Sequence, residues 1–362
     1  MLGLQVEAFV FNTPFIYPAT SSLSSQGSSE SRSSPLKMTA KRYTLGNSAD
    51  NVYGLTLLFA HCIGSHKEQW EPTILRLFHN QLSGPRSRRI REAWSFDWQS
   101  HGDSAGLNQE ALKTRPDGVC AGILEEAIYE WAPAISAFVH SKHMKGHRIV
   151  ALGHSAGAAA VLLSIKDFPL SEPPYLSVIL IEPSIAPRDV YNSRYEERRA
   201  VLEYAVSSTS MRRDTWASRK DAFAYFKSRA PWKLWDERVV RLLVEHGLQE
   251  VSGGVKLKCD RRQEAVSYAD TEPHFEGANT ISRLCHSVHI HLIFGAVNDF
   301  VPDFIQYSLS DTSKGRYVAS VSKIKRAGHM IVQEQPDKLA DSISEILDNI
   351  GAGVYQHVRS RL

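Results

Sequence analysis

From Gly54 onward the chain alternates between short apolar runs and longer amphipathic stretches. The short runs are rich in β-branched and aliphatic residues, whereas the longer stretches repeat apolar residues with the helical period. Strands that alternate with helices in this way build a parallel sheet with helices on its faces. We therefore predict an α/β fold whose strands are Leu55–Ala60, Ala93–Phe96, Arg148–Leu152, Ser177–Ile181, His289–Phe294 and 318–324.

Two of the amphipathic stretches predict helices that pack on this sheet. Apolar residues from Ile123 to Phe138 follow one face of the first helix, and the second starts after Pro336 and ends at Gly351. The alternation stops between 183 and 284, where Arg, Trp and Tyr are frequent and helical patterns occur. This segment predicts a helical cap inserted between two strands of the sheet.

These patterns divide the chain into three parts. We expect an N-terminal part at 1–53, with a strand at 4–11 and a serine-rich loop at 21–35. The core is expected at 54–182 and 286–362, and the helical cap insertion at 183–285.

Composition and charge narrow the class of protein. Apolar residues make up 43% of the sequence and charged residues 22%, which suits a globular protein with a large core. The net charge of +3 argues against a nucleic-acid partner, because such partners usually meet a concentrated basic face. No run reaches the roughly 18 apolar residues of a membrane span, and the N-terminus lacks the features of a secretory signal. The four cysteines form no CxxC pair, so we expect neither zinc nor a disulfide framework. This cysteine usage favours an intracellular compartment.

The segment Gly153-His154-Ser155-Ala156-Gly157 follows a predicted strand and precedes a helix of small residues. A G-x-S-x-G element in this context is typical of the turn that presents the nucleophile in α/β-hydrolases. The glycines are needed there because side chains beside the strained serine would collide with neighbouring backbone. We therefore predict that Ser155 is a nucleophile and that the amide of Ala156 faces the oxyanion. The predicted architecture is the α/β-hydrolase fold, a mostly parallel central sheet flanked by helices, with an inserted helical cap.

Two further segments supply other parts of such a site. The loop 61–64 (HCIG) follows the first core strand, where this fold places a second oxyanion donor. Ile63 is the candidate donor and Cys62 the alternative. His329 lies between the last strand and the last helix and follows the serine in the chain, as in these enzymes. We expect it to be the base, because a histidine exchanges protons near neutral pH.

The acidic partner of His329 stays open between two carboxylates. Glu182 ends one predicted strand and Asp299 follows the next, and hydrolases of this fold use both places. A buried carboxylate on Nδ1 fixes the histidine tautomer and stabilises the imidazolium, so either residue would serve. These parts predict acyl transfer, in which Ser155 attacks a carbonyl, His329 takes its proton and water hydrolyses the acyl-enzyme.

Two other functions suit the same pattern. They are a hydrolase-fold binding protein without catalysis, and a lyase or cyclase that uses the same pocket. Nothing in the sequence resembles a metal-ligand cluster or a dinucleotide loop, so we expect no metal and no organic cofactor. The expected partner is a small-molecule acyl substrate.

Three features together resemble the fungal peroxisomal α/β-hydrolases of secondary metabolism, including those of host-selective toxin pathways and of acyl-CoA hydrolysis. They are the loop 61–64 followed by 67–72 (KEQWEP), the GHSAG element, and the run 212–216 (RRDTW). The resemblance covers most of the chain from Gly54. It implies Glu182 as the acid, although Asp is the expected residue type there.

The C-terminal tripeptide Ser360-Arg361-Leu362 resembles the S-K-L peroxisomal address in its small, basic and leucine positions. We therefore expect a peroxisomal location and a peroxisomal import receptor as partner. Products of β-oxidation accumulate there as CoA thioesters, so the expected substrate is an acyl-CoA or a related ester of a fatty-acid or polyketide intermediate. Six cations of the cap could meet CoA phosphates, although nearby carboxylates predict ion pairs for most of them. The six are Arg198, Arg199, Arg212, Arg213, Arg219 and Lys220.

Overall fold

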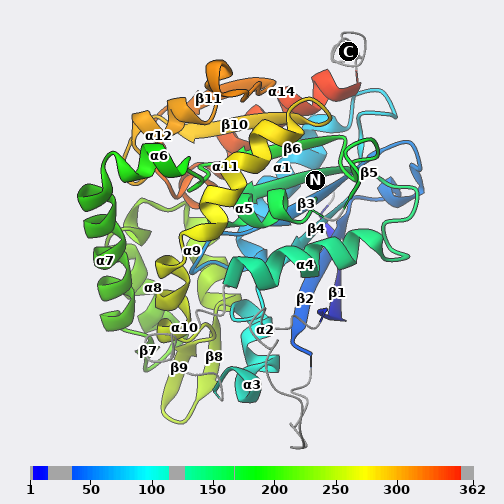
Figure 1. The fold of residues 1–362 in the computed structure, drawn as a ribbon. Coiled ribbons are helices and arrows are strands. Elements are labelled where there is room, and N and C mark those ends of the chain that lie inside the picture. Colours follow the sequence, from blue (N-terminus) through cyan, green and yellow to red (C-terminus); the bar gives the residue numbers. More distant parts are fainter. Residues whose placement is uncertain (1–2, 15–34, 114–126, 167, 352–362) are drawn as a thin grey trace, which may run out of the picture.

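The computed structural model describes residues 3–14, 35–113, 127–166 and 168–351, and its centre is an eight-stranded sheet (Figure 1). The strand order is β1-β2-β4-β3-β5-β6-β10-β11. Strand β2 is antiparallel to both of its neighbours, and the strands from β4 to β11 in this order are parallel. The α/β class is therefore confirmed, with strands β1 Gln5–Asn12, β2 Lys37–Thr44, β3 Leu55–Ala60, β4 Ile90–Phe96, β5 Arg148–His154, β6 Ser177–Ile181, β10 His289–Gly295 and β11 Ser320–Ile324.

All six predicted core strands are present, but the sequence pattern missed β2. Lys41 and Arg42 interrupt its apolar alternation, and both are neutralised by carboxylates from neighbouring elements. Lys41 Nζ lies 3.2 Å from a Glu71 oxygen, and Arg42 Nη2 lies 2.7 Å from a Glu92 oxygen. Because tertiary ion pairs rather than burial of apolar side chains accommodate these residues, the strand has no clear period-2 signal.

Helices cover both faces of the sheet (Figure 1). Leu57 and Phe59 of β3 face a cluster with α1 (Glu71–Gln81) and α14 (Pro336–Gly351). Leu58 and Ala60, which point the other way, face α4 (Ala127–His140), α5 (Ala156–Leu163) and α11 (Glu272–Leu284). The predicted helices after Ile123 and after Pro336 correspond to α4 and α14, although Ile123 itself lies outside the described residues.

The segment between β6 and β10 is not purely helical, which corrects the predicted helical cap. A three-stranded antiparallel sheet, β7-β9-β8, lies among its helices. These strands are two to four residues long, too short to show a period in the sequence. The segment comprises α6 Arg188–Asn192, α7 Tyr195–Met211, β7 Thr215–Trp216, α8 Arg219–Ser228, α9 Glu237–His246, β8 Leu248–Val251, β9 Gly254–Leu257 and α10 Arg261–Ala269, followed by α11.

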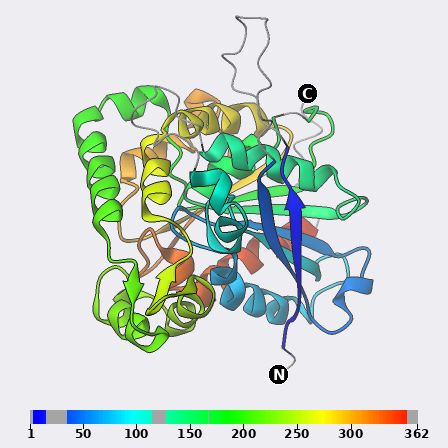
Figure 2. The ribbon, with the colours of Figure 1, turned by 90° about the horizontal axis from the view of Figure 1, so that it is seen from below.

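The elements from α6 to α10, called the insertion from here on, stand at one side of the sheet in both ribbon views (Figures 1 and 2). The insertion has an apolar cluster of its own, built on Trp216, Phe226 and Trp235, whereas α11 packs on α5 within the core. The remaining elements are short: η1 Ser48–Asp50, η2 Lys67–Trp70, α2 Gly102–Leu107, α3 Gln109–Lys113, η3 Trp232–Leu234, α12 Asp303–Ser308, η4 Thr312–Lys314 and α13 Ile331–Glu334.

Two predicted segments fall where the structure gives no description. They are most of the serine-rich tract, at 21–34, and the tripeptide 360–362. Within the described ranges, no helix has both the length and the apolar character that a membrane crossing requires.

Candidate active site

Ser155 occupies a strained turn between β5 and α5. Its φ of 55° and ψ of −117° lie in a region that residues with a side chain rarely adopt. A Cβ on Gly153 would collide with the backbone of Gly157 and Ala158, and a Cβ on Gly157 would collide with that of Ala60. The two glycines therefore let β5, α5 and β3 meet closely enough to hold the serine in this conformation.

Three side chains form a hydrogen-bonded line that starts at Ser155. His329 Nε2 lies 2.9 Å from Ser155 Oγ, and His329 Nδ1 lies 3.1 Å from Glu182 Oε2. Glu182 is buried at the end of β6, and its other oxygen accepts a hydrogen bond of 2.6 Å from the Gly295 amide. The carboxylate is thus held by the backbone of β10 and directed at the imidazole ring.

Asp299, the second carboxylate considered, contacts the main chain of His329 rather than its ring. Its Oδ1 accepts a hydrogen bond of 2.8 Å from the His329 amide. A Cβ on Gly328 would collide with the same carboxylate, so glycine is needed beside the histidine. The structure therefore places Glu182 on the ring and Asp299 on the loop that carries it.

The loop around His329 has further supports that the sequence did not reveal. His154 Nε2 donates to the carbonyl oxygen of His329 at 2.8 Å, and Glu334 accepts from the Gly328 amide at 2.7 Å. The ring of Phe300 packs on His329 with centroids 4.4 Å apart. His154 belongs to the GHSAG element, but its partner is 175 positions away in the sequence, so no local pattern could predict the contact.

The predicted oxyanion donors flank Ser155. Ile63 and Ser155 line the same pocket, and Ala156 begins helix α5 directly after the serine. Within the described part of the chain, no acceptor bonds to the backbone N–H of Ile63 or of Ala156. Cys62 is buried, and burial raises the pKa of its thiol to about 12, so its side chain stays a protonated thiol at neutral pH.

Buried neutral histidines order the loops around the two predicted oxyanion donors, Ile63 and Ala156. His61 accepts from the Trp98 amide at 3.2 Å, and His101 accepts from the Gly64 amide at 3.0 Å. Burial lowers the pKa of both rings to about 3, and does the same for His154. Each ring therefore stays uncharged while it orders a backbone amide or carbonyl near the site.

These histidines predict a pH dependence of stability. In the unfolded chain they bind protons below about pH 6.5, whereas in the folded chain they resist protonation down to about pH 3. Stability present above pH 6.5 is therefore lost as the pH falls, by up to about 1.4 kcal/mol per histidine and pH unit. We expect His101→Asn to reduce the fall in the free energy of unfolding between pH 7 and pH 5, measured by urea titration. Replacement of the exposed His286 by Asn should leave this fall unchanged. If the free energy of unfolding falls equally with pH in the wild type and in both variants, the buried histidines do not cause the pH dependence.

A buried ion network joins the loop after β3 to the loop after β4. Lys67 Nζ lies 2.7 Å from Asp97 Oδ2 and 2.6 Å from Asp103 Oδ2, and the Lys67 amide donates to Asp97 at 2.8 Å. Burial alone would lower the pKa of Lys67, but Asp97, Glu68 and Asp103 raise it above its usual value. The network fixes the position at which the chain leaves the predicted oxyanion loop and enters η2.

Removing this lysine should destabilise the fold strongly. Lys67→Met leaves the fully buried Asp97 without its counter-charge, which we expect to lower the free energy of unfolding by about 3–5 kcal/mol. Lys166→Met is the matched control, because the Lys166 side chain in its ion pair with Glu276 is 57% exposed. Its effect should be about 1 kcal/mol or less in the same denaturant titration. Similar losses in the two variants would contradict a special role for the buried network.

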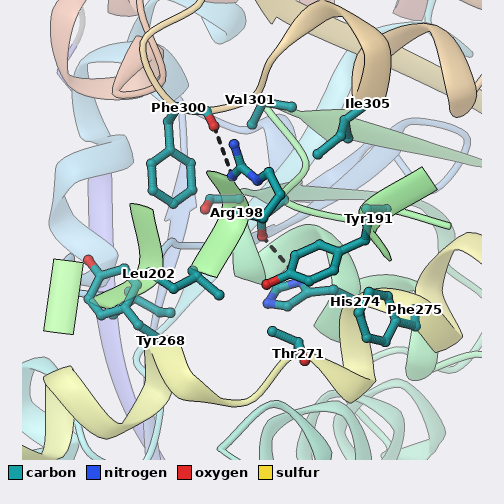
Figure 3. Close-up of a pocket in the computed structure, with 14 residues that line it drawn as sticks. Tyr191, Arg198, Leu202, Tyr268, Thr271, His274, Phe275, Phe300, Val301 and Ile305 are labelled. Atoms are coloured by element: carbon teal, nitrogen blue, oxygen red, sulfur yellow. Dashed lines mark hydrogen bonds between the residues drawn. The ribbon is translucent and has the colours of Figure 1, made fainter. Parts of the chain in front are cut away.

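A pocket opens over Ser155 between the core and the insertion (Figure 3). Its walls come from the loops after β3 and β6, from four helices of the segment between β6 and β10, and from the loop and helix after β10. Most of the lining is apolar or uncharged: Ile63, Ser155, Ser184, Ala186, Tyr191, Arg198, Leu202, Tyr268, Thr271, His274, Phe275, Phe300, Val301 and Ile305. Among the described residues, no group of three or more His, Cys, Asp or Glu side chains is arranged to hold a metal.

The cap cations considered for CoA phosphates have separate partners. Arg212 forms a two-point ion pair with the buried Glu264, at 2.9 and 2.5 Å. The others contact acidic or aromatic groups of the insertion: Arg199 with Glu196 and Glu203, Arg213 with the rings of Trp216 and Tyr225, and Arg219 with Glu250. Ion pairs are thus present for three of the six cations, Arg199, Arg212 and Arg219, whereas Arg198 lines the pocket.

Comparison with known proteins agrees with this geometry. Residues 57–342 match a family model described as the alpha/beta hydrolase family. The chain belongs to the alpha/beta hydrolase family. This alpha/beta hydrolase is therefore an enzyme of the hydrolase class, as the sequence predicted. Sequence comparison with curated proteins finds no match for it.

Solved structures show the same fold at low sequence identity. A peroxisomal alpha-beta-hydrolase from Saccharomyces cerevisiae superposes with a TM-score of 0.73 at 18% identity, covering 96% of this chain and 90% of that one. E-2-(acetamidomethylene)succinate hydrolase gives a TM-score of 0.61 at 19% identity and coverages of 86% and 96%. The thioesterase domain from the curacin biosynthetic pathway gives 0.58 at 13% identity, with 86% and 94% covered.

Proposed function

We propose that this alpha/beta hydrolase cleaves an ester or an acyl-CoA thioester through a covalent acyl-enzyme on Ser155. The observation that carries the proposal is the line from Ser155 Oγ through His329 to Glu182, with distances of 2.9 and 3.1 Å. Glu182 accepts from Nδ1–H, which leaves the lone pair of Nε2 facing the serine hydroxyl. The imidazole is therefore in the tautomer that a general base needs.

The proposed reaction has two acyl-transfer steps. Ser155 Oγ attacks the carbonyl carbon while its proton passes to His329, and the amides of Ile63 and Ala156 stabilise the oxyanion. The protonated His329 then gives the proton to the leaving alcohol or thiol. Water activated by the same histidine attacks the acyl-enzyme, releases the acid and restores Ser155.

Turnover of matched substrates tests the proposed reaction. We expect hydrolysis of a medium-chain acyl group on p-nitrophenol, on pantetheine or on CoA, with one oxygen from ¹⁸O-water in the product acid. Binding without turnover of any of the three would favour a non-catalytic hydrolase-fold protein. A product that lacks the added oxygen would favour a lyase or a cyclase in the same pocket. If CoA and pantetheine thioesters react equally well, cap cations do not recognise the CoA phosphates.

We also propose a peroxisomal location and a role in fungal secondary metabolism, with toxin biosynthesis as the setting. The support is the sequence resemblance, the tripeptide Ser360-Arg361-Leu362, and the fold shared with a yeast protein named as peroxisomal. The receptor that reads such a tripeptide requires it at the free C-terminus. A fluorescent reporter that carries the last dozen residues should enter peroxisomes, and deletion of Leu362 should leave it in the cytosol. A diffuse signal from the intact tail would refute the targeting proposal.

A further inference from the structure

Arg198 brings a buried positive charge into the pocket that Ser155 lines. It lies on α7, is 7% exposed, and extends between Phe300 and Tyr191 in Figure 3. All 14 lining residues are described, and Arg198 is the only lysine, arginine, aspartate or glutamate among them. His274, the other basic side chain there, is neutral at pH 7 because burial lowers its pKa to about 4.

The guanidinium has few partners for a buried cation. Its Nη2 donates to the Phe300 carbonyl at 3.2 Å, and its buried Nε has no hydrogen-bond acceptor among the described residues. No described carboxylate forms an ion pair with it, and the neighbouring Glu197 is paired with Arg194 at 3.6 Å. Burial lowers the pKa of Arg198, yet an arginine stays protonated at neutral pH. An ionised group buried in this way is costly unless an anion compensates it.

Other arginines of the insertion show what compensation looks like in this protein. Arg212, whose side chain is 17% exposed, has both terminal nitrogens on the carboxylate of Glu264. Arg198 lacks such a carboxylate and faces the pocket instead. Because Arg198 and Ser155 line the same pocket, the guanidinium lies beside the space that a substrate would occupy.

We propose that Arg198 binds a carboxylate of the substrate, so that the preferred substrate is an ester or thioester with a second, ionised acid group on its acyl chain. A planar guanidinium binds a carboxylate through two parallel hydrogen bonds. One cation in an otherwise uncharged pocket neutralises a single negative charge. A phosphate with a charge near −2 would leave one negative charge without a partner. The apolar walls, including Leu202, Val301 and Ile305, suit the carbon chain between the two acid groups.

This inference rests on the proposed hydrolase function, and wild-type selectivity tests it without any variant. The substrates are mono-p-nitrophenyl esters of C6 to C10 dicarboxylic acids and the same compounds capped as methyl esters at the free acid. We expect kcat/KM to be at least about tenfold higher for the best free acid than for its methyl ester. Equal or lower values for every free acid would overturn the inference. Turnover of the capped esters would still support the hydrolase, so the two claims fail separately.

Variants separate recognition from a structural role of Arg198 at the Phe300 loop. Arg198→Met should lower kcat/KM for the free acids by a factor on the order of 10² more than it lowers kcat/KM for the capped esters. Arg198→Lys should restore part of the difference, because it returns the charge without the planar fork. The control is Arg199→Met, an exposed neighbour whose partners are Glu196 and Glu203. Equal losses on free and capped esters would show that Arg198 only supports the loop.

Discussion

Ser155→Ala is expected to lower kcat for ester hydrolysis by a factor on the order of 10⁴ or more, with the fold intact. The variant removes the only atom that forms the proposed acyl-enzyme, and His329 alone then has no nucleophile to activate. The hydroxyl makes a single hydrogen bond among the described residues, to His329 Nε2, so its loss should cost little stability. Initial rates with a p-nitrophenyl ester and a thermal unfolding curve measure the two effects.

Ser208→Ala provides the control for this experiment. Ser208 is an exposed serine on α7 whose hydroxyl bonds only to the carbonyl of Ala205 among the described residues, and it does not line the pocket. Its replacement should leave kcat within about twofold of wild type. Turnover near the wild-type rate in Ser155→Ala would rule out the proposed mechanism.

Glu182→Gln is expected to have the second largest effect, a fall in kcat on the order of 10³ to 10⁴. Glutamine keeps the shape of the side chain, but its amide group can donate to Nδ1 and so favour the tautomer in which Nε2 is protonated. That tautomer cannot accept the proton of Ser155. The measurement is kcat on the same ester, with the circular dichroism spectrum as a check on folding.

Asp299→Asn is the matched comparison for Glu182→Gln. Asp299 accepts a hydrogen bond from the main chain of His329, and the asparagine carbonyl can still accept it. We therefore expect kcat to fall by about tenfold or less, because the loop that carries His329 is held less firmly. If Asp299→Asn has the larger effect, Asp299 rather than Glu182 is the acid that acts on His329.

The sequence could not choose between these two carboxylates, and the reason lies in the sheet. Strands β6 and β10 are neighbours and parallel, so Glu182 and Asp299 both follow carboxyl ends at one edge. Their difference is a matter of side-chain direction: Glu182 adopts a φ of 44° and faces the ring of His329, which no local pattern encodes. By contrast, the G-x-S-x-G turn was predictable because its glycines are required by close backbone contacts within a few residues and with β3.

Arg198 shows the same limit in the insertion. The sequence grouped it with the other cap cations that could meet CoA phosphates, because α7 is largely polar and gives a weak indication of its inner face. Only tertiary packing shows that Arg198 and Leu202, four positions apart on one helical face, line the pocket. The small sheet of the insertion escaped detection for a related reason, since its strands are too short to show a period.

Covalent labelling tests whether Ser155 is an activated nucleophile. The folded protein is treated with a fluorophosphonate, and the adduct is located by mass spectrometry of its proteolytic peptides. We expect one adduct per chain, on the peptide that contains Ser155, with none in Ser155→Ala or after heat denaturation. A strong adduct on another serine, or an unlabelled Ser155 in the folded protein, would contradict it.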